Sequence, residues 1–389
     1  MTGVTPSTSK PEYYSEDGIP WVTPTDINAL TISDTPRKLS EEGMRVGRVV
    51  PANTILCTCI ASIGKNALLT VKGSFNQQIN SLTPNTKNDA YFLLTESELW
   101  SDKMKRMAAS GTMQIVNKSE FAALTTMVPS IDEQKKLGTC FSNLDNLITL
   151  HQRKLDKLVN VKKSMLEKMF PQQGSRIPEI RFCGFTDDWE QREFSEMFDC
   201  TISNNTLSRS ELSYEEGSIL NIHYGDILIK YGSILDIHKY KIPRIPNKKK
   251  EDFKGSLLQP GDVVIADTAE DETSGKACEI GGLFGNSIVA GLHTMVARPN
   301  IEMASGYLGY YLNSNAYHCQ LLPMMQGIKV QSLSRANVKK TALKFPESTK
   351  EQQLIANYFI QLDELITLHQ RKLEKLKNIK KSMLEKMFI

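Results

Sequence analysis

Two stretches of this chain nearly repeat each other: EQKKLGTCFSNLDNLITLHQRKLDKLVNVKKSMLEKMF at 133–170 and EQQLIANYFIQLDELITLHQRKLEKLKNIKKSMLEKMF at 351–388. They lie 218 residues apart, and roughly two-thirds of their positions are identical without a gap. The blocks LITLHQRKL and KKSMLEKMF match completely, whereas the segments that precede the repeats share only fragments. This self-similarity indicates a duplicated unit in which the repeated stretch is constant and the preceding domain varies.

Each repeat carries mostly apolar residues at spacings of four and three. In the first copy these are Leu137, Phe141, Leu144, Ile148, His151, Leu155, Leu158, Lys162, Met165 and Met169, and the second copy has the same register from Ile355 to Met387. The sustained 3.5-residue period predicts two helices, each roughly 57 Å long, that pack as an antiparallel coiled coil around a pseudo-twofold axis. The polar interruptions at His151 and Lys162 recur in the copy, where they either fix the register or serve a switch or ligand role.

The rest of the sequence predicts two mixed α/β domains, an α+β fold class overall. In the first, the apolar run 51–64 and the alternating run 72–84 are typical of strands, and 89–109 has helical periodicity. In the second, GDILIKYGSI, PGDVVIADT and SIVAGLHTMVA predict strands, and Ile301–Tyr317 predicts a helix. Prolines 129 and 346 close the domains, because no helix runs through them from upstream. The predicted order is domain 1–132, helical region 133–170, connector 171–177, domain 178–350 and helical region 351–389.

Composition indicates a globular protein of the cytoplasm. The chain has 389 residues, 40% of them apolar, with no apolar run near the roughly 18 residues of a membrane span, and its polar N-terminus is no signal peptide. The seven scattered cysteines include no C-x-x-C pair, so we expect them to be reduced and mostly buried, without a metal site. The net charge of +3 neither indicates nor excludes nucleic-acid binding, because a nucleic-acid binder needs only local clusters of Lys and Arg.

No catalytic motif is visible. The sequence contains no Pro-Pro pair, hence no N-P-P-aromatic methyltransferase loop, and the Gly-Lys pairs at Gly64 and Gly275 lack the rest of a phosphate-binding P-loop. The isolated D-x-K at 252–254 lies in a charged run where it is expected by chance. The chain is therefore predicted not to be an enzyme.

Many exposed positions of the two repeated helices are also identical. Packing of one helix on the other requires only that the positions at spacings of four and three stay apolar. Either a recent duplication or recombination left the whole helix alike, or each copy presents one surface to the same partner. The divergence of the flanking domains favours a shared partner, so we predict two identical subunits bound, one per half. The candidate partner-binding residues are Gln152, Arg153, Lys157, Lys163 and Glu167, with Gln370, Arg371, Lys375, Lys381 and Glu385 in the copy.

Over essentially its whole length the chain resembles a specificity subunit of a type I restriction-modification system. The resemblance rests on GxTPST, PEYY and IPW within 3–21, NQQI at 76–79, PxxxEQ before the first helix, PEIRFxGFxxxW at 178–189, and LxPGDVV, GKA and GLH within 258–293. It implies two target-recognition domains, two conserved helical regions and two bound methyltransferase subunits. Adenine methylation and cleavage, with S-adenosylmethionine, ATP and Mg²⁺, would then belong to partner subunits, including restriction subunits, and this chain would need no cofactor. One departure is that Pro178 to Cys200 has no counterpart before Thr5.

A reader of duplex DNA needs cations for phosphates, and Arg, Lys, Asn or Gln for base edges. The candidates in the first domain are Lys10, Lys65, Asn66, Asn76, Gln77, Gln78, Lys105, Arg106, Gln114 and Lys118. Those in the second are Lys239, Lys241, Arg244, Lys248, Lys249 and Lys250 of the stretch KYKIPRIPNKKK, with Lys276, Lys329, Gln331 and Arg335. Asp26 and Asp267 could accept a hydrogen bond from a cytosine amino group or cap a turn.

Because the two domains differ, we predict an asymmetric bipartite target whose unread spacer is set by the coiled coil. Two alternatives remain at this stage. One is a coiled-coil scaffold that joins protein partners without touching DNA, which predicts no salt-dependent binding to duplex DNA. The other is the recognition half of an enzyme with its own nuclease.

Overall fold

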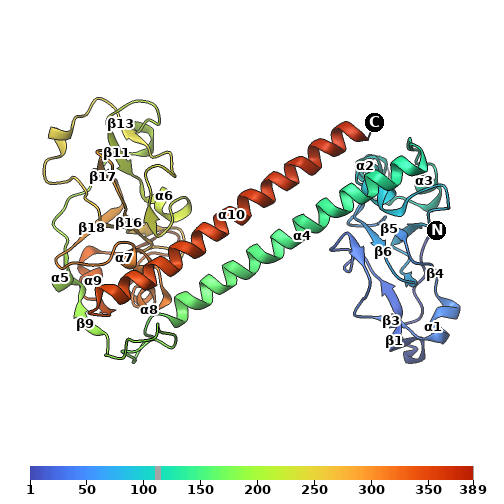
Figure 1. Ribbon diagram of the computed structural model, residues 1–389, viewed down its shortest axis with the longest axis horizontal. Helices are drawn as coiled ribbons and strands as arrows, with labels where there is room; N and C mark the ends of the chain where they lie inside the picture. Colours follow the sequence, from blue (N-terminus) through green and yellow to red (C-terminus); the bar gives the residue numbers. More distant parts are fainter. Residues whose placement is uncertain (110–114, 389) are drawn as a thin grey trace. The chain divides into compact units, whose positions relative to one another are not determined.

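The computed structural model describes residues 1–109 and 115–388, which form two compact units (Figure 1). Unit 1 combines Met1–Arg153 with Arg371–Ile389, and unit 2 is Lys154–Gln370. Each unit therefore contains one mixed α/β domain, the N-terminal part of the long helix that follows this domain, and the C-terminal part of the other long helix. The predicted mixed α/β class is confirmed.

Unit 1 holds two four-stranded sheets, with strand orders β3-β1-β7-β4 and β2-β6-β5-β8. The strands are β1 (Tyr14–Val22), β2 (Thr31–Ile32), β3 (Lys38–Leu39), β4 (Val49–Val50), β5 (Thr54–Thr58), β6 (Asn66–Leu69), β7 (Gly73–Phe75) and β8 (Ile79–Leu82). The helices of the domain are η1 (Pro11–Tyr13), α1 (Glu41–Val46), α2 (Ala90–Ala109) and α3 (Lys118–Ala122). Helix α2 covers β5 and β6 with Phe92, Trp100 and Met104, all buried.

Unit 2 is built on a five-stranded sheet of order β10-β18-β14-β16-β12, a three-stranded sheet β13-β11-β17 and the pairs β15-β19 and β20-β9. Its strands are β9 (Glu190–Glu193), β10 (Phe198–Asp199), β11 (Ile219–Ile222), β12 (Ile234–Leu235), β13 (Arg244–Ile245), β14 (Val263–Ala266), β15 (Thr268–Ala269), β16 (Ala277–Ile280), β17 (Ser287–Ala290), β18 (Thr294–Pro299), β19 (Gln331–Ser332) and β20 (Ala342–Phe345). Its short helices are α5 (Phe194–Met197), η2 (Arg209–Glu211), α6 (Tyr224–Ile229), η3 (Lys250–Phe253), α7 (Tyr307–Leu312), α8 (Asn315–His318), η4 (Leu322–Met324) and α9 (Arg335–Val338).

The predicted single helix over Ile301–Tyr317 is wrong. The backbone reaches α7 through Gly306, whose φ of 86° is left-handed and interrupts any helix arriving from upstream. The amides of Gly306 and Gly309 donate to the Glu279 carboxylate at 2.5 and 2.9 Å, and burial raises the pKa of Glu279 to about 7. A buried side chain from another strand thus decides where this helix begins.

The long helices are α4 (Ile131–Lys168) and α10 (Thr349–Met387), and within unit 1 they run antiparallel. Phe141 of α4 contacts Phe388 with ring centroids 5.4 Å apart. One turn further along α4, Asp145 pairs with Lys380, which lies eight residues before Phe388. The direction of one helix therefore reverses that of the other.

Unit 2 repeats this pairing with the roles of the helices exchanged. Phe359 of α10 stacks on Phe170, which follows α4, at a centroid distance of 5.9 Å. Asp363 Oδ1 lies 2.6 Å from Lys162 Nζ. Each of these four residues stands 218 positions from its equivalent in unit 1, so the repeated sequence produces equivalent contacts in both units.

A repeated glutamine joins each long helix to its own domain. Gln134 Nε2 donates to the carbonyl of the proline that closes the domain, at 2.8 Å, and its Oε1 accepts from the Asp89 amide at 3.0 Å. Gln352 makes the same two contacts, with the corresponding proline at 2.8 Å and with the Ala304 amide at 2.9 Å. Both side chains are 1% exposed, so these hydrogen bonds are shielded from water.

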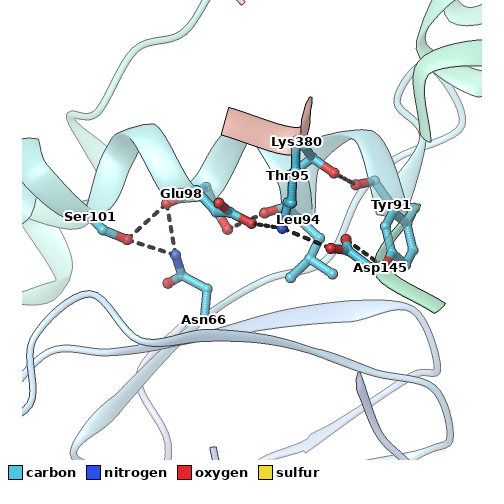
Figure 2. Close-up of polar contacts among 9 residues, drawn as sticks. Asn66, Tyr91, Leu94, Thr95, Glu98, Ser101, Asp145 and Lys380 are labelled. Atoms are coloured by element: carbon cyan, nitrogen blue, oxygen red, sulfur yellow. Dashed lines mark hydrogen bonds and ion pairs between the residues drawn. The ribbon is translucent and has the colours of Figure 1, made fainter. Parts of the chain in front are cut away.

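A polar cluster holds α10 against unit 1 (Figure 2). Lys380 Nζ lies 2.5 Å from Glu98 Oε1 and 2.9 Å from Asp145 Oδ1, and the Tyr91 hydroxyl donates to Asp145 Oδ2 at 3.1 Å. Burial alone would lower the pKa of Lys380, but the two carboxylates outweigh it and raise this pKa. Lys380, the lysine at one of the repeat's mostly apolar positions, is therefore a half-buried cation paired with two carboxylates.

Replacing Lys380 with methionine is expected to destabilise unit 1 by about 3–5 kcal/mol, because the Asp145 carboxylate would stay buried without its cation. The matched control is Lys162→Met at the repeat position in unit 2. There the paired side chains are 24% and 28% exposed, so the loss should be about 1 kcal/mol or less. Urea unfolding followed by tryptophan fluorescence compares the two variants, and equal losses would contradict this assignment.

Candidate nucleic-acid interface

In unit 1, three loops meet beside the ends of β5 and β7. The Cys59 amide donates to the Gln78 carbonyl at 2.9 Å, and the Cys59 carbonyl accepts from the Val116 amide at 2.9 Å. Cys59 thus joins all three loops through its backbone amide and carbonyl. Because these contacts involve no side chain, the side chains of the loops can vary without breaking them. The loops are 59–66, 76–78 and 115–118.

Unit 2 contains the same arrangement. The Asp267 amide donates to the His293 carbonyl at 3.1 Å, and the Asp267 carbonyl accepts from the Leu333 amide at 2.8 Å. Strand β15 pairs with β19 immediately beside this point. The loops are 267–276, 291–293 and 326–335. We call this arrangement of loops in each unit the three-loop junction.

The junctions share backbone hydrogen bonds and hardly any sequence. Such loops, fixed by a rigid scaffold and free to vary in side chains, are where proteins commonly place binding residues. Two domains with equivalent junctions can therefore recognise the same class of ligand through different contacts.

Several candidates of unit 1 have exposed side chains at this junction, namely Lys65, Gln77 and Lys118. Lys65 also lines a cavity of about 440 Å³, together with Lys105 of α2 and residues 61–64. Cations on two elements therefore face one hollow beside the junction. Arg106 is exposed on α2, Lys10 lies over the Tyr13 ring at 5.3 Å, and Gln114 lies outside the described residues.

Other candidates of unit 1 have internal partners. Asn66 Nδ2 donates to the Ser97 carbonyl at 2.7 Å and to Ser101 Oγ at 2.9 Å (Figure 2). Asn76 is 8% exposed and bonds both the amide and the side chain of Gln78, at 3.0 and 3.2 Å. The two asparagines therefore shape the loops, and the exposed neighbours are better placed for a ligand.

The candidate DNA-binding residues of unit 2 also divide into exposed side chains and side chains with partners inside the unit. At the junction, Lys329 is exposed and Gln331 half-buried. Lys276 Nζ donates to the Leu228 carbonyl at 2.7 Å, and burial lowers its pKa, while Arg335 donates to the Cys200 carbonyl at 3.0 Å. Both of these cations are engaged with the backbone of their own unit.

The basic stretch 239–250 does not form one patch around the junction. Strand β13 lies within it and runs antiparallel to β11, so residues before and after β13 lie at opposite ends of the sheet. Lys239 and Lys241 fall at the end where β11 stops, and Lys241 pairs with Glu215. Lys248, Lys249 and Lys250 are exposed at the other end, and Arg244, in β13 itself, donates to the Gly217 carbonyl at 3.2 Å.

Sequence reasoning missed a group of aromatic and histidine side chains at the unit 2 junction. Tyr224 lies edge-on to His293 at 5.3 Å and against His223 at 4.7 Å, and His293 Nδ1 lies 3.3 Å from Thr268 Oγ1. Burial lowers the pKa of His223, which keeps its ring neutral near pH 7. The GLH motif included His293, but strand positions alone could not bring it beside Tyr224.

The two aspartates considered as base readers have different surroundings. Asp26 accepts from the amide and hydroxyl of Thr23 at 2.8 and 2.7 Å, so it caps a turn. Asp267 is at the centre of the unit 2 junction, with Oδ1 3.6 Å from His293 Nδ1. Only the second lies where a ligand of the junction would contact it.

The candidate partner-binding side chains of the helices are exposed, except for the half-buried Gln152. Next to them lie exposed leucines at repeat positions, Leu147 and Leu150 in α4 and Leu365 and Leu368 in α10, with exposures from 42% to 60%. Leu166 and Leu384, which also occupy equivalent positions of the two helices, are half-buried. We call the four exposed leucines the duplicated leucine pairs.

Within residues 1–109 and 115–388, no group of three or more His, Cys, Asp or Glu side chains has the geometry of a metal site. None of the helices in these residues is long and apolar enough to cross a membrane. All seven cysteines have free thiols, with Cys57, Cys59, Cys200 and Cys278 buried, Cys140 and Cys183 exposed and Cys319 half-buried.

Comparison with known proteins places the chain in a family. The family model of the type I restriction modification DNA specificity domain matches residues 2–160 and 186–378. The specificity subunit of the type I restriction enzyme MjaVIII from Methanocaldococcus jannaschii is 23% identical over 352 residues, 86% of this chain and 78% of that protein. The MjaIX specificity subunit of the same organism is 27% identical over 175 residues, 43% of this chain and 40% of that protein. The chain thus spans less than half the length of this last relative.

A solved structure has the same fold. The S subunit of a type I restriction-modification system from M. genitalium matches with a TM-score of 0.56 at 14% identity, covering 100% of this chain and 93% of that one. The family model covers well over half of the residues, in two segments that follow the internal duplication. The chain therefore belongs to the family of type I restriction-modification specificity subunits.

Proposed function

We propose that this chain directs a type I restriction-modification complex to an asymmetric bipartite target in duplex DNA, with one half-site contacted by each three-loop junction. The observation that carries the proposal is the presence of equivalent junctions in two domains of different sequence. Base edges in the major groove differ in their hydrogen-bonding groups, so loops with different side chains select different bases. Two unlike junctions on one chain are suited to two unlike half-sites.

The proposed contacts follow from exposure and chemistry. Lys65 and Lys118 would bind phosphates of one half-site, and Gln77 would donate and accept at a base edge. In unit 2 the corresponding groups are Lys329 for phosphate and His293 for a base edge. Gln77 and His293 would provide specificity, and the lysines would provide affinity that falls with salt.

The chemistry of the complex is proposed to belong to its partners. The duplicated leucine pairs and the charged residues beside them would dock two identical adenine methyltransferase subunits, one on each helix. Restriction subunits would join through these, and S-adenosylmethionine, ATP and Mg²⁺ would be bound by the partners in the cytoplasm. We further propose that α4 and α10 pack as a coiled coil that sets the spacer between the half-sites.

The test is duplex binding by the chain co-purified with its methyltransferase, using fluorescence anisotropy at several salt concentrations. Gln77→Ala should reduce discrimination in one half-site by about 1–3 kcal/mol and leave the other unchanged. His293→Ala should do the reverse, so each variant controls for the other. The double change Lys65→Glu and Lys118→Glu should weaken binding to all sequences and flatten the salt dependence. Binding that is insensitive to salt and to all these changes would favour a protein scaffold.

A further inference from the structure

The unit 2 junction contains two histidines that contact the same tyrosine. His223 directly follows β11, and His293 directly precedes β18. The Gly291 amide donates to the Ile222 carbonyl at 2.9 Å, so the two histidines belong to chain segments that are bonded to each other. The Tyr224 ring lies 4.7 Å from the His223 ring and 5.3 Å from the His293 ring. The two imidazoles therefore form one cluster around Tyr224.

The tautomer of His223 is fixed by the helix that it caps. His223 Nδ1 accepts a hydrogen bond from the Gly225 amide at 3.1 Å, at the start of α6. A backbone amide can only donate, so Nδ1 carries no proton. Burial lowers the pKa of His223 and keeps its ring neutral. The single proton of this neutral imidazole is therefore on Nε2, which makes Nε2 a hydrogen-bond donor.

The tautomer of His293 is fixed in the opposite sense by Asp267 and Thr268. The Thr268 hydroxyl donates to Asp267 Oδ1 at 2.8 Å. His293 Nδ1 lies 3.3 Å from Thr268 Oγ1 and 3.6 Å from the same Asp267 oxygen. The carboxylate can only accept, and the hydroxyl has already donated its proton to it, so both oxygens favour a proton on Nδ1. When the His293 ring is neutral, its Nε2 is therefore an acceptor.

Both Nε2 atoms are available to a ligand of the junction. Neither takes part in a hydrogen bond within residues 1–109 and 115–388. The His293 side chain is 47% exposed, and His223 is half-buried. His293 also has a left-handed φ of 56°, a conformation that costs free energy in a residue with a side chain and is concentrated at functional sites. The junction thus offers one donor and one acceptor that the fold itself does not use.

We propose that His223 and His293 together select one adenine in the half-site of unit 2, an inference that rests on the proposed function of the junction. In the major groove, adenine presents the acceptor N7 beside the donor amino group on N6. His223 Nε2 would donate to N7, and His293 Nε2 would accept from the amino group. Guanine presents two acceptors, so its O6 would face the lone pair of His293. Cytosine presents only the amino group and thymine only an acceptor, so neither matches both histidines.

The two tautomers can be measured without DNA. Long-range 1H–15N correlation spectra of the chain with 15N-labelled histidine distinguish a proton on Nδ1 from a proton on Nε2. At a pH of about 8, where the rings are neutral, His223 should carry its proton on Nε2 and His293 on Nδ1. The variants His223→Ser and His293→Ala assign the signals, and the serine keeps an acceptor for the Gly225 amide. The same tautomer in both rings would overturn the proposal.

Base analogues test the contact itself. The chain co-purified with its methyltransferase binds the duplex selected from a random library, at the same pH, with each adenine replaced in turn. One analogue is 7-deazaadenine, which lacks the N7 acceptor, and the other is the base purine, which lacks the amino group. At one and the same adenine each analogue should lower the affinity about tenfold, because each removes one hydrogen bond. Analogues that change nothing, or that act at different bases, would overturn the proposal.

Each histidine should account for one analogue. His293→Ala should make binding insensitive to purine at that adenine and leave the effect of 7-deazaadenine, and His223→Ser should do the reverse. The matched control is His238→Ala, because His238 lies outside the three loops, with its ring 4.6 Å from that of Phe284. This control should keep both effects at full size. Equal sensitivity of all three variants to the two analogues would contradict the assignment of the two hydrogen bonds.

The adenine contact and the proposed function fail in different ways. A complex that prefers its selected duplex over unrelated DNA but ignores both analogues would keep the proposed function and overturn only the adenine contact. A change of discrimination at a cytosine in His293→Ala would also overturn the adenine contact alone. A complex with no preference between the selected duplex and unrelated DNA would overturn both.

Discussion

On the proposed function, replacing both Leu150 and Leu368 with arginine is expected to abolish adenine methylation at the bipartite target, because both methyltransferase subunits would be lost. The two side chains are 60% and 45% exposed at equivalent positions of α4 and α10. Exposed leucines recurring in both copies fit a docking surface for one kind of partner, and a charge at such a surface commonly reduces affinity a hundredfold or more. Co-purification with a tagged methyltransferase and sequencing of methylated adenines measure the two steps separately.

The matched control for this change is Val159→Lys. Val159 is 46% exposed on α4, but its repeat position already carries Lys377, so it cannot belong to a surface shared by both copies. This variant should keep both partners. Leu150→Arg alone should leave a complex with one methyltransferase subunit, measurable by native mass spectrometry. A double variant that retains two subunits would place the partner elsewhere on the chain.

Inserting seven residues into each long helix is expected to lengthen the spacer of the proposed bipartite target and leave both half-sites unchanged. The insertions belong between Arg153 and Lys154 in α4 and between Gln370 and Arg371 in α10, where the two units divide. Seven residues preserve the 3.5-residue period and add about 10.5 Å, roughly three base pairs of duplex. Binding to the original target should fall to the level of unrelated DNA.

Binding-site selection from a random duplex library measures this result, with the unaltered chain selected in parallel. An insertion in α4 alone serves as the control, because it shifts one helix against the other and should disrupt Lys380 with Asp145 or Lys162 with Asp363. Altered half-sites at a constant spacer would contradict the proposal that the helices act as the spacer.

The mixed α/β class and the two long helices could be predicted because their patterns are local and repeated. The apolar period of 133–170 and 351–388 needs no knowledge of distant residues. The break at Gly306 could not be predicted, since it depends on the Glu279 carboxylate from another strand. Tertiary hydrogen bonds of this kind override a helical pattern that is acceptable by itself.

The candidate DNA interface was less predictable than the fold. Residue type alone suggested Lys276 and Arg335, but their hydrogen bonds to the backbone carbonyls of Leu228 and Cys200 come from folding. The side-chain amide of Asn66 is likewise engaged within the fold, because it donates to the Ser97 carbonyl in α2. Each junction is formed by three loops that are distant in the sequence. Which of their polar side chains are exposed depends on contacts between these loops, and one sequence alone does not give those contacts.

The most direct test of the central claim is single-molecule sequencing of methylated adenines in cells that carry this gene together with its methyltransferase gene, against cells that lack this gene alone. If this chain determines the recognised sequence, one bipartite motif, with unlike half-sites and a fixed spacer, is methylated in the first cells and unmethylated in the second. An unchanged pattern of methylation, with the protein expressed and assembled with its partner, would contradict a role in sequence recognition.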